Sequence, residues 1–239
     1  SEEDLRGLEG VWGSHATPAE LSDRYEEMFQ FTKASAQDLA AQRASQDAFG
    51  LRPTFSIVVP LYHTPVDFFR EMAESALRQS YGRLELVLVN STPEDRELAD
   101  EVWALANRDR RVRVVELERN YGITENTNYG IDAATGDFVC FFDHDDVLEP
   151  NILFEYAMRV REDPSTDMIY CDEDLLVDGT YRRPAFKSDW SLVQEETNNY
   201  VCHMLTMRRE LVDGFYSRYD GAQDHRLTLV AGSRARHVG

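Results

Sequence analysis

Residues 137–146 read Asp-Phe-Val-Cys-Phe-Phe-Asp-His-Asp-Asp, and this stretch decides how the fold is interpreted. The apolar run Phe138–Phe142 ends abruptly at three acids, Asp143, Asp145 and Asp146. The pattern predicts a buried strand that delivers carboxylates to the edge of a sheet. Carboxylates this close repel one another, and a divalent cation such as Mg²⁺ or Mn²⁺ would remove that cost and attract substrate phosphates. The structural alternative is a strand end followed by a solvated acidic turn.

On both sides of this stretch, the chain alternates strand and helix patterns. Strands are predicted at residues 55–60, 84–89, 112–116 and 137–142, and helices between them at 64–79, 94–107 and 124–134. This β-α-β-α-β-α-β order is typical of an α/β fold with a doubly wound, mostly parallel sheet flanked by helices. Ligands of such sheets bind beyond the carboxyl ends of the strands. Polar residues follow three of those ends, at Tyr62-His63, Asn90-Ser91 and Asp143–Asp146.

Composition and charge exclude several classes of protein. The 239 residues carry a formal net charge of −19, so neither nucleic acid nor an anionic membrane surface is expected as the main partner. No apolar run approaches the roughly 18 residues that cross a bilayer, and no signal peptide opens the chain. Cys140, Cys171 and Cys202 lack the spacing of a zinc site or a disulfide framework. We therefore expect a reduced, cytoplasmic setting, either free or peripheral at the inner face of the membrane.

Residues 1–50 differ in pattern from the rest of the chain. They are acidic and lack a strand pattern, but Thr17-Pro18-Ala19-Glu20 is a good helix start, with a capping Thr and a Glu three residues later. Apolar residues then follow at helical spacing, at Leu21, Tyr25, Met28 and Phe29. We interpret residues 1–50 as an N-terminal helical extension that packs on a main domain of residues 51–239. The alternative is a partner-binding element or one through which the chain associates with itself.

A set of short motifs stands along the chain in a fixed order. They are Ser56-Ile-Val-Val-Pro-Leu-Tyr62, Ser75-Ala-Leu-Arg-Gln-Ser-Tyr81, Glu85-Leu-Val-Leu-Val-Asn90, Asn120-Tyr-Gly-Ile123, Asn128-Tyr-Gly-Ile-Asp-Ala-Ala-Thr-Gly-Asp137, Phe142-Asp-His-Asp-Asp-Val-Leu148 and Gln223-Asp224. Together they resemble the family 2 glycosyltransferases of the GT-A fold. Further segments resemble the branch that builds bacterial surface polysaccharide, which includes rhamnose-transferring enzymes: Tyr170–Asp174, Phe186–Trp190, Asn199–His203 and Gly221–Leu227. The resemblance covers residues 54–239. Relatives usually continue past the point matched by Gly239, so we expect a truncated chain or one module of a longer protein.

The resemblance implies a donor site built around a metal ion. In this family the acids bind the sugar nucleotide, with Asp143 at the ribose or the metal, and Asp145 on a Mn²⁺ or Mg²⁺ ion that bridges the diphosphate. His144, between them, is assigned to the donor side. His237 lies where GT-A enzymes sometimes supply a further metal ligand. The cation would neutralise the leaving nucleoside diphosphate.

The resemblance also implies where the donor base binds. Pro60, Leu61 and Tyr62 would line the base, and Asn90 stands where the family usually has Asp. Because Asn both donates and accepts hydrogen bonds, the choice of base is open, with a UDP- or dTDP-linked sugar expected. Asn128 is a candidate donor contact, with helix packing or a bond to a loop as the alternative.

Asp224 matches the family's catalytic base. Inverting transfer needs a carboxylate that deprotonates the acceptor hydroxyl as this hydroxyl attacks; the structural alternative is a plain helix N-cap. Asp189, Trp190 and His203 are assigned to a glycan or lipid-linked glycan acceptor, with packing in the core as the alternative for Trp190 and His203. The resemblance thus implies a metal-dependent, inverting glycosyltransferase. The competing hypothesis is a non-catalytic module that binds a sugar nucleotide or a partner.

Overall fold

The computed structural model describes residues 18–239, with side chains from residue 24 onward. The predicted helix cap at Thr17 and the side chain of Leu21 therefore lie outside the described residues. The chain divides into two compact units, Ser1–Ser35 with Asp172–Lys187, and Ala36–Cys171 with Ser188–Gly239. The sequence suggested a boundary at residue 50, whereas the units divide after Ser35. Within the described part of the chain, no helix is both long and apolar enough to cross a membrane.

The larger unit is built on a seven-stranded sheet with the order β3-β2-β1-β4-β8-β5-β9. Its strands are β1 (Phe55–Leu61), β2 (Leu84–Asn90), β3 (Val112–Glu116), β4 (Phe138–Phe141), β5 (Thr166–Ile169), β8 (Thr206–Arg208) and β9 (His237–Val238). Strand β8 runs antiparallel to its neighbours β4 and β5, and the other pairings are parallel. The predicted doubly wound, mostly parallel sheet is confirmed.

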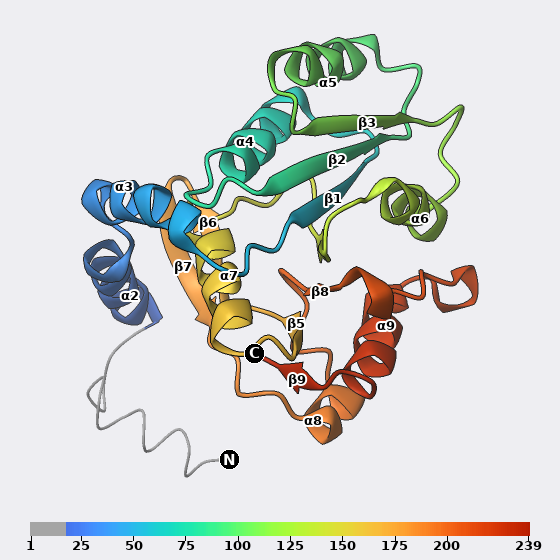
Figure 1. The fold of residues 1–239 in the computed structure, drawn as a ribbon. Helices are drawn as coiled ribbons and strands as arrows, with labels where there is room; N and C mark the ends of the chain where they lie inside the picture. Colours follow the sequence, from blue (N-terminus) through green and yellow to red (C-terminus); the bar gives the residue numbers. More distant parts are fainter. Residues whose placement is uncertain (1–17) are drawn as a thin grey trace. The chain divides into compact units, whose positions relative to one another are not determined.

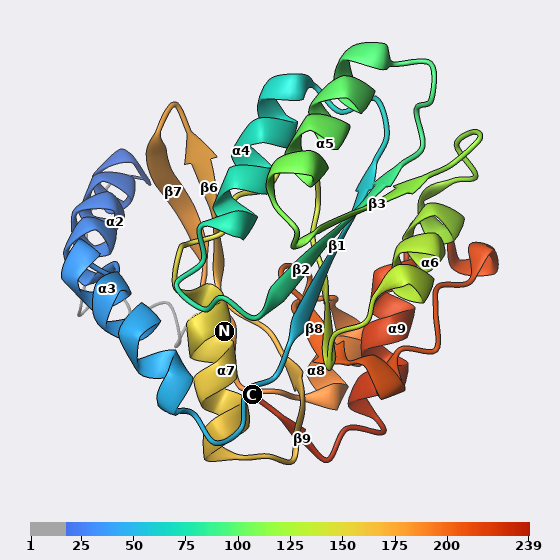
Figure 2. The same cartoon turned by 45° about the horizontal axis from the view of Figure 1, so that its top comes forward.

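Helices cover both faces of this sheet (Figures 1 and 2). The helices of this unit are α3 (Ala36–Ser45), α4 (Val66–Leu77), α5 (Arg96–Arg108), α6 (Ile123–Ala133), α7 (Ile152–Glu162), α8 (Leu192–Thr197) and α9 (Gln223–Gly232), with 3₁₀ turns at Gln46–Ala48, Arg209–Leu211 and Ser217–Tyr219. Because side chains alternate along a strand, Ile57 and Val59 pack in the layer of α4, α5 and α7, while Val58 and Val87 pack beneath α6. Helix α6 approaches closely at Gly130, where a Cβ would lie 2.4 Å from Val58 Cγ1.

The smaller unit pairs an N-terminal helix with a hairpin. Helix α2 (Pro18–Thr32) lies against strands β6 (Glu173–Val177) and β7 (Thr180–Ala185). The hairpin turns at Asp178-Gly179, where both residues have positive φ, as a tight hairpin turn requires. The ring of Phe29 packs 4.2 Å from that of Tyr181, and the Tyr25 hydroxyl donates to Asp174. Burial raises the pKa of Asp174, although the bond from Tyr25 opposes this.

Candidate active site

Strand β4 brings acidic side chains to the carboxyl edge of the sheet. It ends at Phe141, and in the turn that follows, the Asp146 N–H lies 3.4 Å from the Asp143 carbonyl oxygen. Antiparallel β8 pairs Thr206 with Cys140. Continuing that register for three residues sets His203 beside Asp143. Two segments that are 60 positions apart therefore meet at one point of the edge.

Asp143, Asp146 and His203 form a cluster that could hold a metal ion. His203 Nδ1 lies 3.8 Å from Asp143 Oδ2 and 3.6 Å from Asp146 Oδ2. One ligand atom from each residue lies within 4.8 Å of the other two. Carboxylates are ligands of Mg²⁺ and Mn²⁺, and an imidazole nitrogen is a ligand that transition metals accept. The donor set therefore fits a divalent cation.

Asp145 takes no part in this cluster among the described residues, and its side chain is exposed. Its assignment as a metal ligand stays a prediction, while the geometry adds two candidates. The sequence named Asp146 without giving it a role, and it placed His203 on the acceptor side. A signal for His203 was present in the segment Asn199–His203, but its position beside Asp143 follows only from the pairing of β8 with β4.

Charge accumulates at this edge. The pKa of Asp143 is raised, first by burial and then by the negative charges of Asp145 and Asp224, while His203 and His144 oppose the rise. Half of the Asp143 side chain, 51%, remains accessible, so solvent screens part of this effect. The acids at this edge are therefore more stable together when a positive charge lies among them.

Asp224, the predicted base, lies close enough to act on Asp143 electrostatically. It stands in the first turn of α9, just after Gly221, whose φ of +90° turns the chain into the helix. Asn199 Nδ2 donates a hydrogen bond of 2.9 Å to Asp224 Oδ2. The structure therefore brings Asp143 and Asp224 to one region of the fold, and it adds Asn199 as a partner that the sequence did not indicate.

A buried carboxyl group, that of Glu195, lies within electrostatic range of Asp224. Glu195 in α8 is fully buried, and its Oε2 accepts the Tyr200 N–H at 3.2 Å. Burial raises the pKa of Glu195, while the backbone N–H groups of Tyr200 and Val201 and the neighbouring His225 oppose the rise. His225 Nε2 lies 2.6 Å from the Glu195 carbonyl oxygen. These contacts join α8 to the start of α9.

The first strand end offers one accessible side chain of the three predicted to line a base. Leu61 is fully buried beneath α4, and Pro60 is buried in the sheet. Pro60 is tolerated there because pairing with β4 ends at Val58, so its missing N–H breaks no ladder bond. Tyr62 is 46% exposed, and its ring packs at a tilt on that of His63 with 4.2 Å between ring centroids. Of these three residues, only Tyr62 has an accessible side chain.

Asn90 is buried and already bonded on both sides. Its Oδ1 accepts the Thr92 N–H at 3.1 Å, and its Nδ2 lies 3.3 Å from a carboxylate oxygen of Glu116. Glu116 also accepts the indole N–H of Trp103 at 2.9 Å. An Asp at position 90 would face the Glu116 carboxylate, which gives a structural reason for an amide where the family usually has an acid.

Other predicted contacts are used within the fold. Asn128 bonds the backbone N–H and carbonyl oxygen of Phe215 at 2.8 and 3.0 Å, which is the loop-bonding alternative. Trp190 packs on α9, since a Cβ at Gly232 would lie 2.2 Å from its Cζ2 atom. Asp189 is exposed, and its carbonyl oxygen lies 3.4 Å from the Tyr200 hydroxyl.

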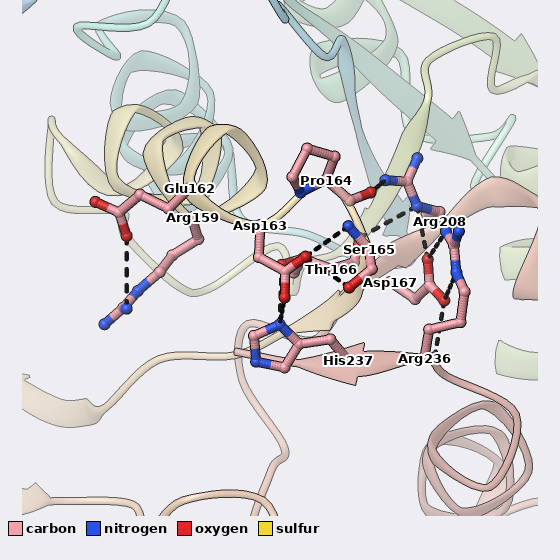
Figure 3. A network of polar contacts seen from close by, with 10 residues as sticks. All are labelled: Arg159, Glu162, Asp163, Pro164, Ser165, Thr166, Asp167, Arg208, Arg236 and His237. Atoms are coloured by element: carbon pink, nitrogen blue, oxygen red, sulfur yellow. Dashed lines mark hydrogen bonds and ion pairs between the residues drawn. The ribbon is translucent and has the colours of Figure 1, made fainter.

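His237 lies at the opposite edge of the sheet from Asp143. It pairs with Thr166 at the start of β5, at the level of the amino end of β4. Six strand residues separate that level from Asp143, or about 20 Å. His237 Nδ1 instead bonds Asp163 Oδ2 at 2.5 Å (Figure 3). The prediction that His237 joins the Asp143 metal site is therefore corrected: β9 pairs with the amino-terminal end of β5, and this places His237 far from Asp143.

The fold and the acidic edge define a GT-A type glycosyltransferase domain, and the comparisons with known proteins agree. Residues 56–215 match Glycosyl transferase family 2, and the chain belongs to this family. It is 34% identical over 212 residues to the O-antigen biosynthesis protein RfbC of Myxococcus xanthus, covering 86% of this chain and 17% of RfbC. The chain spans 17% of the length of RfbC and 20% of the length of a second curated relative, from Sinorhizobium fredii.

Solved structures share the fold at lower identity. S. aureus TarS 1–349 in complex with UDP has a TM-score of 0.65 at 24% identity, covering 77% of this chain and 56% of that one. The mannosyltransferase PcManGT from Pyrobaculum calidifontis, in complex with GDP-Man and Mn²⁺, has a TM-score of 0.59 at 18% identity, covering 84% of this chain and 61% of that one.

Proposed function

We propose that this chain is the sugar-transferring module of an inverting glycosyltransferase. It would move a sugar from a UDP- or dTDP-linked donor to a hydroxyl of a glycan or lipid-linked glycan. The observation that carries the proposal is the cluster of Asp143, Asp146 and His203 at the carboxyl edge of a family 2 sheet, within electrostatic range of Asp224. A departing diphosphate needs a counter-charge and an attacking hydroxyl needs a base, and this edge offers residues for both.

The three clustered residues would hold the divalent cation, with the neighbouring Asp145 as a further candidate ligand. When bound, the cation would neutralise the charge that develops on the leaving nucleoside diphosphate. The imidazole of His203 favours Mn²⁺ over Mg²⁺, because Mg²⁺ prefers oxygen ligands. The structurally similar mannosyltransferase was solved with Mn²⁺, which supports the same choice.

Asp224 would remove the proton from the acceptor hydroxyl. Its Oδ2 is engaged by Asn199, so Oδ1 is the oxygen assigned to the proton. The attacking hydroxyl approaches from the face opposite the leaving group, which is why transfer would proceed with inversion. Asp189 and the accessible part of Trp190 remain the proposed acceptor contacts.

The donor and the biological setting follow from the relatives. TarS was solved with UDP and the mannosyltransferase with GDP-Man, and the higher TM-score and identity of TarS favour a pyrimidine nucleotide, with Tyr62 and the region of Asn90 as its proposed contacts. RfbC is named for O-antigen biosynthesis, which supports a polysaccharide product. The free cysteines fit a reduced, cytoplasmic setting for this module.

Thermal shift with nucleotides tests the proposal. UDP or dTDP at about 100 times Kd should stabilise the protein by about 2.7 kcal/mol in Mn²⁺. At about 2–4 °C per kcal/mol for a chain of this size, the melting temperature should rise by about 5–11 °C. Asp143→Asn and His203→Ala should lose the Mn²⁺-dependent part, while Asp132→Asn, an exposed acid on α6, should keep it. Equal stabilisation in EDTA would contradict the metal site.

A further inference from the structure

We propose that Asn199 is the positioning residue of Asp224: its side-chain amide fixes the carboxylate so that one oxygen faces the acceptor hydroxyl. This inference rests on the proposed function, because it assumes that Asp224 removes the proton. The direct contact is the 2.9 Å bond from Asn199 Nδ2 to Asp224 Oδ2. It joins the segment that follows α8 to the first turn of α9, across 25 positions of sequence.

One buried residue, Glu195, holds the segments at both ends of this bond, through its side chain on one side and its backbone on the other. The Glu195 carboxylate accepts the Tyr200 N–H at 3.2 Å, which fixes the backbone next to Asn199. On the other side, His225 follows Asp224 directly, and its Nε2 lies 2.6 Å from the Glu195 carbonyl oxygen. The amide and the carboxylate therefore meet between two anchored segments, and neither depends on a flexible surface side chain.

The orientation of the Asn199 amide is set by its bond to Asp224, and not by a hydrogen bond to its own oxygen. Its Oδ1 is buried and has no hydrogen-bond partner among the described residues. Leaving such an oxygen unpaired destabilises the folded state. Rotating the amide by half a turn would set Oδ1 against Asp224 Oδ2, and two acceptors would then repel each other. The N–H bond to the carboxylate, which is charge-assisted, therefore decides the orientation.

The consequence for catalysis is a fixed direction of proton transfer. With Oδ2 held by Asn199, Asp224 presents Oδ1 to the acceptor, and the carboxylate plane cannot turn freely. A displacement of about 1 Å of a reacting group can cost about 10²-fold in rate. We expect Asn199→Ala to lower kcat by about 10–100-fold and to leave the dissociation constant of UDP with Mn²⁺ unchanged.

Turnover is measured in Mn²⁺ as release of UDP from UDP-GlcNAc and from UDP-glucose, with water as the acceptor hydroxyl that Asp224 would deprotonate. Asn199→Asp is the sharpest variant, because it keeps the size of the side chain but replaces the donor by an acceptor; it should lose at least as much rate as Asn199→Ala. Asn151→Ala is the matched control, since Asn151 also donates to a carboxylate, that of Glu155, on the surface of α7. It should turn over at the parent rate.

A double variant separates a positioning role from a structural one. If Asn199 acts through Asp224, Asn199→Ala should cost nothing further in an Asp224→Asn background. Losses that multiply, or parent rates in Asn199→Ala and Asn199→Asp, would overturn the inference. Parent rates in Asp224→Asn would instead overturn the assignment of the base. A melting-temperature cycle of Asn199→Ala with Asp224→Ala checks the bond without turnover: the two losses should be non-additive, and strict additivity contradicts the bond.

Discussion

Asp167→Ala tests how the C-terminal strand is held on the sheet that carries the site. Asp167 lies in β5 and is 3% exposed. Arg208 Nε donates to it at 2.7 Å, and Arg236 donates through its backbone N–H, Nε and Nη2 at 2.9, 2.9 and 2.6 Å (Figure 3). Because Arg208 ends β8 and Arg236 precedes β9, one carboxylate joins three strands. Strand β8 is also the strand that follows His203.

The expected loss follows from the burial of the partners. Removing one member of a buried ion pair costs about 3–5 kcal/mol, because the remaining charge has no counterpart. The side chains of Arg208 and Arg236 are 21% and 58% exposed, so water compensates them in part. We therefore expect a loss of about 2–4 kcal/mol for Asp167→Ala. At about 2–4 °C per kcal/mol, the melting temperature should fall by about 4–16 °C.

The dependence on pH supplies a second check. Burial alone would raise the pKa of Asp167, but the hydrogen bonds from Arg236 and Arg208 outweigh it and hold the pKa below its usual value. A carboxyl whose pKa is lowered by folding contributes stability in full above its unfolded pKa, and loses it as the pH falls through the folded value. The parent should therefore exceed Asp167→Asn in melting temperature by the largest amount at pH 7, and this difference should shrink below about pH 4.

Circular dichroism melting from pH 7 to pH 3 measures both effects. Asp163→Ala is the control: Asp163 bonds Ser165 and His237 at the same edge, but its side chain is 43% exposed, so the melting temperature should change less. A fall of less than about 2 °C for Asp167→Ala, or a difference for Asp167→Asn that is constant with pH, would refute the reasoning.

Three further substitutions have defined outcomes. Asp224→Asn should keep nucleotide binding by thermal shift while transfer falls by about 10²–10⁴-fold; near-parent transfer would show that another acid is the base. Gly232→Val should displace the Trp190 ring and destabilise the protein by about 1–3 kcal/mol in urea unfolding, with a change in tryptophan fluorescence; an unchanged spectrum would contradict this packing. Asn90→Asp should lower the melting temperature at pH 7 through repulsion from Glu116, and Glu116→Gln in the same chain should restore it; no rescue would assign the loss to other contacts.

Much of the fold was readable from local sequence patterns. The predicted strand at 137–142 is β4 at Phe138–Phe141, and the predicted helix at 64–79 is α4 at Val66–Leu77. These elements are readable because a buried strand needs a short apolar run and a helix needs its own start signals. The position of Asp143 at the carboxyl edge also follows, since parallel strands end at one edge of a sheet.

The partners of those acids depended on the tertiary structure. His203 meets Asp143 because β8 pairs antiparallel to β4, and no local pattern sets that register. Asn199 and Asp224 likewise meet only because α8 packs on α9. The pairing of β9 with β5 places His237 at the opposite edge of the sheet from Asp143. Local sequence patterns determine where each strand and helix lies, and therefore which residues follow the end of each strand. Which side chains face one another depends on strand register and helix packing, and these are set by contacts between residues far apart in the chain.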